Sequence, residues 1–210
     1  MSLLSCTSNP ADPPPPGPTV DLTGYFLLPG PGFSKFFSDG QSRAYVGADT
    51  LNGFNVVDVL NGSDLSHDFF RTSDRAWVGN LDTAGGGTIF LFQPPLAALP
   101  DLFPETEYHV ANSGIVTQSG LAPVRRISKL LDTALVDSVP AWRFDSVILI
   151  RQEFWRFITV LGVPDTLRDS AYRWYAPGVD EIKAKIWFEG DTDSTYREFI
   201  GGTIDGRTYP

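Results

Sequence analysis

Short runs of β-branched, aromatic and aliphatic residues recur roughly every ten to fifteen positions after residue 18, separated by turn-forming residues. This spacing is typical of antiparallel strands joined by short connections. We therefore expect a chain that is all-β and mainly antiparallel, with at most one or two short helices. The predicted strands cover residues 19–28, 43–48, 54–60, 68–72, 88–93, 105–111, 143–151, 153–161, 181–189 and 197–204.

Two dipeptides give the most specific turn signals. Asn52-Gly53 lies between two apolar runs and favours the positive φ values of a tight hairpin turn. In Pro177-Gly178, proline presets φ at the second turn position, and glycine accepts the positive φ that a type II turn needs at the third. Pro177 and Gly178 are therefore expected to form a structural turn that leads into a strand.

Alternation predicts which face of a strand is buried. In 181–189 the apolar residues occupy the even positions up to 188, as in a half-buried strand. In 105–111 the alternation predicts that Tyr108 and Val110 face the core while His109 faces solvent.

Two segments give weaker signals. In 124–136, apolar residues three or four positions apart fit a helical stripe, so one helix is an alternative to a strand there. Residues 94–104 contain four prolines and are expected to form a loop, with a short helical turn around 96–99.

The first 18 residues differ in composition from the rest of the chain. Four consecutive prolines favour an extended polyproline conformation and exclude a helix or the interior of a sheet. We therefore expect an extended arm or tether over 1–18 and a single antiparallel β domain over 19–210. The four prolines are Pro13, Pro14, Pro15 and Pro16.

Composition excludes several classes of function. The formal net charge of −9 disfavours binding to nucleic acid, because few cations are available to neutralise phosphates. No run reaches the ~18 uninterrupted apolar residues that a transmembrane helix needs. Cys6 is the sole cysteine, so the chain cannot form an intramolecular disulfide.

The sequence contains no recognisable catalytic or metal-binding pattern. His67 and His109 are isolated and lack a third ligand at the spacing of a zinc site. The glycines at 85–87 are not followed by the lysine of a phosphate-binding loop. We therefore expect no enzyme activity, no catalytic residues, no metal and no cofactor; a hydrolase that uses carboxylates is the least favoured alternative.

Four short motifs together resemble a known family. They are 47–53 (GADTLNG), 69–71 (FFR), 139–144 (VPAWRF) and 174–183 (WYAPGVDEIK). In this order they are similar to segments of bacterial lipoprotein-like β domains of unassigned activity. The resemblance implies that the sheet is a meander curled into an open half-barrel, or a single curled sheet.

The segment Leu3-Leu4-Ser5-Cys6 is similar to the end of a lipobox, and the polar, proline-rich residues after it are similar to the tether of a lipoprotein. If Cys6 is lipidated, we expect the protein at the membrane, on its periplasmic or cell-surface side. If Met1 is the native start, we expect it at the cytoplasmic face.

Several predicted strands carry large apolar groups on both faces. Trp155 and Phe157 alternate with Phe154, and Trp187 follows Ile186. Either the sheet encloses an apolar groove, or one face docks on another protein.

We favour a non-catalytic accessory subunit that docks on a membrane-associated assembly through the arm and this aromatic face. The alternative is a surface or periplasmic lipoprotein that holds an acyl chain or pigment in a curled sheet. In both cases the expected contacts are Trp155, Phe157 and Trp187, with the four prolines of the arm in the first.

Overall fold

The computed structural model describes residues 18–62, 65–83, 86–117, 120–160 and 162–210. This part of the chain forms β-strands and contains no helix that could cross a membrane. The arm predicted over 1–18, with Cys6 and the four consecutive prolines, lies outside the described residues except for Pro18. The strands are β1 (Thr19–Asp21), β2 (Ser34–Phe37), β3 (Ser42–Leu51), β4 (Phe54–Asn61), β5 (Ser66–Arg71), β6 (Trp77–Asp82), β7 (Thr88–Leu96), β8 (Leu102–Pro104), β9 (Tyr108–Thr117), β10 (Gly120–Val139), β11 (Trp142–Val160), β12 (Val163–Ala176), β13 (Asp180–Trp187), β14 (Thr195–Ile204) and β15 (Arg207–Tyr209).

The main sheet closes on itself. Its strand order is β13-β12-β11-β10-β9-β7-β6-β5-β4-β3-β2-β14, and β14 also pairs with β13, which completes a barrel of twelve strands. All these pairings are antiparallel, as predicted. The prediction of a single curled sheet or open half-barrel is therefore wrong. Closure pairs the two strands that would otherwise be exposed sheet edges.

One strand makes the closure. The first part of β14 pairs with β13, from Thr195 opposite Ile186 to Glu198 opposite Lys183. Its second part pairs with β2, from Phe199 opposite Phe37 onwards. A strand that changes partner halfway along its length joins the two halves of the barrel.

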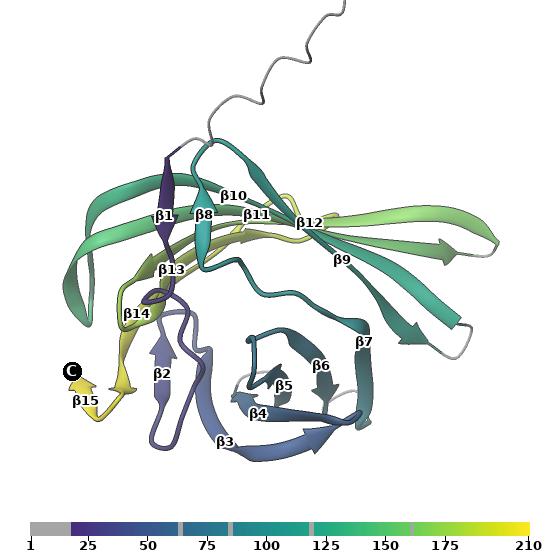
Figure 1. The fold of residues 1–210 in the computed structure, drawn as a ribbon, viewed down its shortest axis with the longest axis horizontal. Coiled ribbons are helices and arrows are strands. Elements are labelled where there is room, and N and C mark those ends of the chain that lie inside the picture. The colour runs from purple at the N-terminus through teal and green to yellow at the C-terminus, as the bar shows by residue number, and fades with distance from the viewer. Residues whose placement is uncertain (1–17, 63–64, 84–85, 118–119, 161) are drawn as a thin grey trace, which may run out of the picture.

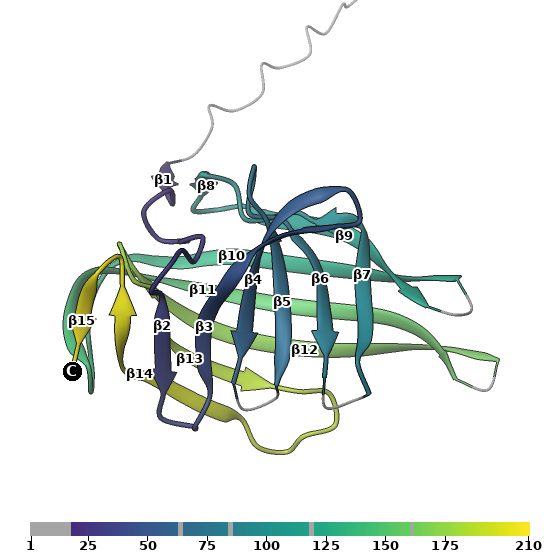
Figure 2. The same ribbon diagram turned by 90° about the horizontal axis from the view of Figure 1, so that it is seen from below.

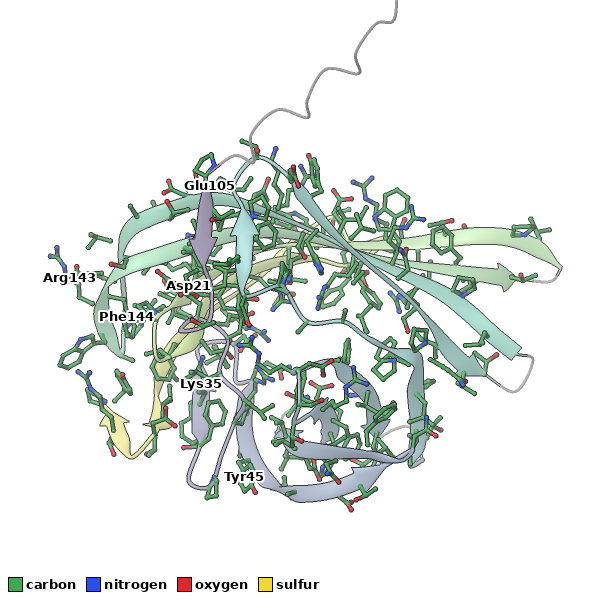
Figure 3. The ribbon with its side chains drawn as sticks, in the orientation of Figure 1. Asp21, Lys35, Tyr45, Glu105, Arg143 and Phe144 are labelled. Carbon is green, nitrogen blue, oxygen red and sulfur yellow. The ribbon has the colours of Figure 1, made fainter. Side chains whose placement is uncertain are left out.

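The barrel has two unequal walls. The long strands β10, β11 and β12 form one wall, and the shorter strands β2 to β7 run across their direction on the other (Figures 1 and 2). The β9–β10 and β11–β12 hairpins extend beyond the barrel on one side (Figure 1). In Figure 3, Arg143 projects outward near the β10–β11 turn, while Lys35 lies among the strands.

A separate two-stranded sheet of β1 and β8 packs on the long wall. Leu22 and Phe103 are fully buried there and form one apolar cluster with Ile148, Ile150 and Tyr175 of the wall. Burying such a large apolar side chain contributes about 1.5–3 kcal/mol. The segments 22–33 and 97–101 beside this sheet are thereby held against the barrel interior.

Two turns form where the sequence indicated them. Asn52 and Gly53 have φ values of 50° and 79° and connect β3 to β4, which confirms the predicted hairpin. At Pro177-Gly178, the Val179 N–H donates to the Ala176 carbonyl at 3.1 Å, and Gly178 has φ 71°. This turn leads from β12 into β13.

The helical alternative for 124–136 is wrong, because the whole segment belongs to β10. The apolar residues of the expected stripe do not share one face of this strand, since Val124 is buried whereas Leu131 and Ala134 are exposed. The helical turn expected around 96–99 is also absent, since Leu96 ends β7 and the residues after it are extended.

The predicted faces of 105–111 are reversed. Tyr108 and Val110 are 58% and 47% exposed, whereas Ala111 is buried. His109 lies opposite Ser128 in the sheet register and faces the interior with it. Burial lowers the pKa of His109, with Arg126 as a second cause. On the outer face, the Lys129 amine lies over the Tyr108 ring, 4.9 Å from its centre.

Candidate ligand-binding site

The barrel interior contains three adjoining cavities of 200, 440 and 500 Å³, and Arg173 lines all of them. The first lies beneath the segments 22–33 and 97–101 and reaches Tyr175. The second lies between β6–β7 and β10–β13, with Trp77, Phe154 and Ile186 in its wall. Protein interiors are normally close-packed, so spaces of this size are suited to solvent or a ligand.

Strand register determines which side chains line these cavities. Across β10, β11 and β12, Arg126 lies opposite Phe154, which lies opposite Asp169. One pleat further along, Ser128 lies opposite Gln152. Directly opposed residues point to the same face of a sheet. These rows therefore face the interior, while the intervening residues face outward.

The interior carries a buried charge cluster centred on Glu181. Arg197 donates to its Oε1 from Nε at 2.9 Å and from a terminal nitrogen at 2.6 Å, and Arg173 donates to Oε2. Burial alone raises the pKa of Glu181, but Arg197 and Arg173 together hold it well below its usual range. Glu181 is therefore a carboxylate shared by two strands next to the closure.

Lys35 is the second member of this cluster and is fully buried. Its amine donates to the carbonyls of Val179, at 3.1 Å, and Glu181, and lies 5.2 Å from the centre of the Phe199 ring. Burial lowers its pKa to about 8. Lys35 belongs to β2, whereas its acceptors lie in the β12–β13 turn and at the start of β13, so it connects the two walls beside the closure.

Asp180 pairs with Arg43 at 3.6 Å, and burial raises the pKa of Asp180. The residues around the first cavity thus bring together more cations than carboxylates, which is unusual in a chain of net charge −9. The cations that line it are Arg43, Arg75, Arg126 and Arg173, and the carboxylates are Asp180 and Glu181.

Arg126 differs from the other interior arginines because it has no carboxylate partner among the described residues. It donates to the Ala97 carbonyl, and its Nε is buried without a hydrogen-bond partner. Burial lowers its pKa to about 10, while Tyr175 acts in the opposite direction and Arg173 in the same one. It lines both the first and second cavities.

The aromatic residues predicted as contacts lie on the outer face. Trp155 donates to Glu153 at 3.1 Å and lies under the Arg168 guanidinium, 5.2 Å from the ring centre. Phe157 packs against Trp155, with ring centres 6.3 Å apart. Trp187 lies opposite Ser170, on the same outer face as Trp155. None of the three lines the interior cavities described above.

The histidines do not form a metal site. His67 lies 2.7 Å from Asp58, from Nδ1 to Oδ1. Among the described residues, no three His, Cys, Asp or Glu side chains gather as metal ligands would. Sequence reasoning missed Arg126 and Gln152 because each adjoins a residue of similar polarity, and only strand register shows which one faces inward. It missed Arg173 because a cation between two aromatic residues is expected to face solvent.

No protein-family model and no curated protein matches the chain. Among solved structures, it is similar to a protein from Parabacteroides distasonis ATCC 8503 that is predicted to be a lipoprotein, with 12% identity and a TM-score of 0.40. The match covers 84% of this chain and 97% of the other. A match at this identity carries over no residue roles, so the function is inferred from the barrel interior itself.

Proposed function

We propose that this protein is a non-catalytic binding protein that holds an elongated apolar ligand, such as an acyl chain, inside its barrel. The observation that carries the proposal is the 440 Å³ cavity, in whose wall an apolar set lies beside polar side chains that include four arginines. The apolar set comprises Trp77, Leu96, Phe154, Ala171, Ile186 and Phe188. Apolar and aromatic walls with a few placed polar groups are typical of small-molecule sites.

The strand arrangement favours a ligand over a purely structural core. Phe92 and Leu96 are buried and pack with Trp77 and Phe154 on one side of the space, yet the interior between the walls stays open. Apolar groups gain about 25 cal/mol per Å² when they leave water for such a surface. An acyl chain lying along Trp77 and Phe154 would gain this free energy along its length.

The lipobox-like segment that ends at Cys6 supports a place at the membrane for such a carrier. A lipidated Cys6 would tether the barrel at the periplasmic or cell-surface side. A barrel held there could take an acyl chain from, or deliver one to, the lipid next to it.

Filling the cavity is expected to abolish uptake. Ala171 is buried, lines the cavity and lies opposite Gln152, so Ala171→Phe would place a ring where the ligand lies. Overpacking costs about 1–3 kcal/mol, so the fold is expected to survive. Native mass spectrometry of protein prepared without detergent, with and without added acyl ligand, measures the outcome.

Ala134→Phe on the exposed part of β10 is the matched control and should bind as the unchanged protein does. Retention of ligand by Ala171→Phe, or absence of any ligand from the unchanged protein, would count against a carrier.

A second candidate function is docking on a larger membrane-associated assembly. The feature that favours it is the outer aromatic row of Trp155 and Phe157 with Arg168, since aromatic residues and arginine are the usual interface anchors. We expect deletion of residues 1–18 to weaken association without unfolding the barrel. A mild-detergent pull-down with full-length and shortened protein tests this, and recovery of a lone monomer from both would exclude it.

A further inference from the structure

We infer that the barrel selects ligands with an anionic head group and that Arg126 receives this group. The inference rests on the proposed function, because it identifies the polar end of the ligand that the cavity holds. The chemistry it requires is a carboxylate or a phosphate monoester on an apolar chain.

The first argument is the unmet bonding capacity of Arg126. A guanidinium carries five N–H donors, and here the described partners are limited to the Ala97 carbonyl. Its Nε is enclosed by protein without an acceptor, as are those of Arg43, Arg156 and Arg173, but each of these three has a carboxylate partner. A buried cation without a counterion is costly, and a ligand oxyanion would supply what the protein does not.

The second argument is that neighbouring carboxylates are already engaged. Glu181 is shared by Arg173 and Arg197, and Asp169 pairs with Arg156 at 2.9 Å. Asp180 lies 3.6 Å from Arg43. The protein therefore neutralises the cations around Arg126 and leaves Arg126 itself for another anion.

The third argument is the local potential. Arg126 and Arg173 both line the first cavity, and the charge of Arg173 adds to burial in lowering the pKa of Arg126. Gln152 and Tyr175 border the same space and add polar groups that can orient an oxyanion. This excess of positive charge disfavours a cationic head group, and a neutral one would leave Arg126 unpaired.

The position of Arg126 also matches the apolar wall. It lies opposite Phe154 in the sheet register and borders the cavity that Trp77 and Leu96 line. A head group held by Arg126 would direct an apolar chain along Phe154 towards Ile186. The head group and the apolar chain of one amphipathic molecule could therefore bind at adjoining positions, the head at Arg126 and the chain at Phe154.

The test compares ligands that share a chain and differ in the head group. Isothermal titration calorimetry measures the binding of decanoate, decyl phosphate and decanol to the unchanged protein and to Arg126→Gln. We expect Arg126→Gln to weaken binding of the preferred anion by about 10- to 100-fold and to leave decanol unaffected. The two anions distinguish a carboxylate site from a phosphate site.

The neighbouring residue supplies a matched control. Arg125 lies on the exposed face of the same strand and donates to Asn112 at 3.0 Å, so Arg125→Gln removes the same charge outside the barrel. It should bind all three ligands as the unchanged protein does. Arg126→Lys keeps the positive charge but loses the planar guanidinium, so it should lose part of the affinity for the anion. If circular dichroism shows that Arg126→Gln does not fold, the comparison is made with Arg126→Lys instead.

The outcomes separate this inference from the proposed function. Equal binding of decanol and both anions, unchanged in Arg126→Gln, would overturn the anion site and leave the carrier standing. Equal weakening by Arg125→Gln and Arg126→Gln would also overturn it, because long-range charge would explain the effect. Failure of all three ligands to bind the unchanged protein would overturn the carrier itself.

Discussion

Replacing Glu181 with glutamine is expected to lower the free energy of unfolding by about 3–5 kcal/mol. Glu181 is almost fully buried and accepts hydrogen bonds from Arg173 and Arg197. Lys35 donates to its backbone carbonyl from the other wall. With a neutral amide at position 181, the positive charges of Lys35, Arg173 and Arg197 lose the carboxylate that partly neutralises them. Chemical denaturation followed by tryptophan fluorescence measures the change.

Glu198→Gln is the control, because Glu198 is partly exposed and lies 3.5 Å from Lys183. An exposed pair of this kind contributes about 0–1 kcal/mol. Equal losses in the two variants would show that the buried cluster has no special role in stability.

The lowered pKa of Glu181 also predicts that the protein loses stability at acid pH. Since the folded pKa of Glu181 is lowered, its contribution is fully present above the unfolded-state pKa of about 4.3 and decreases as the pH falls below that value. Stability of the unchanged protein should therefore fall more steeply than that of Glu181→Gln below about pH 4. If the stability of both proteins fell equally with pH, the pairing of Glu181 with Arg173 and Arg197 would be contradicted.

Replacing Gly202 with alanine is expected to cost about 2–5 kcal/mol and to open the barrel. Gly202 has φ 147° and pairs with Lys35 of β2 and Tyr209 of β15. A β-carbon there would collide with the Ser34 carbonyl oxygen and lie 3.0 Å from the Lys35 α-carbon. The neighbouring strand would have to move, and the β2–β14 pairing closes the sheet.

The matched control is Gly47→Ala in β3, where an added β-carbon meets nothing within 4 Å and φ is not positive. Hydrogen exchange of β2 and β14 amides reports opening directly. Full protection of these amides in Gly202→Ala, with unchanged stability, would show that β14 does not need this close approach.

Local signals in the sequence predicted several strands and two turns, but they missed β2, β6 and β12 and divided β11 into two strands. Asn52-Gly53 forms its turn because the two positive φ values it favours are what a hairpin needs. The alternation in 181–189 places Ile182, Ala184 and Ile186 inside, as expected from period two. These features depend on residues that are close in sequence, so they can be predicted from the sequence alone.

Closure could not be predicted, because it depends on where β14 meets β13 and β2, and these contacts are distant in sequence. The faces of β9 were reversed for a related reason. Polarity favoured an exposed His109, but the register with β10 places it beside Ser128 on the inner face. Tyr108 and Val110 can occupy the outer face because much of any protein surface is apolar.

The candidate site was missed by the same limitation. Trp155 and Arg126 each adjoin a residue of similar character, Phe154 and Arg125, and period two places the members of each pair on opposite faces. Which member faces inward follows only from the closed barrel. Aromatic content therefore indicated the outer Trp155, whereas the interior holds Phe154 and an unpaired arginine.

A crystal structure of the protein with bound decanoate tests the central claim most directly. We predict a closed barrel with the carboxylate within hydrogen-bonding distance of the Arg126 guanidinium and the chain lying along Trp77 and Phe154. Decanoate bound only on the outer face, or lying inside with its carboxylate turned away from Arg126, would contradict it.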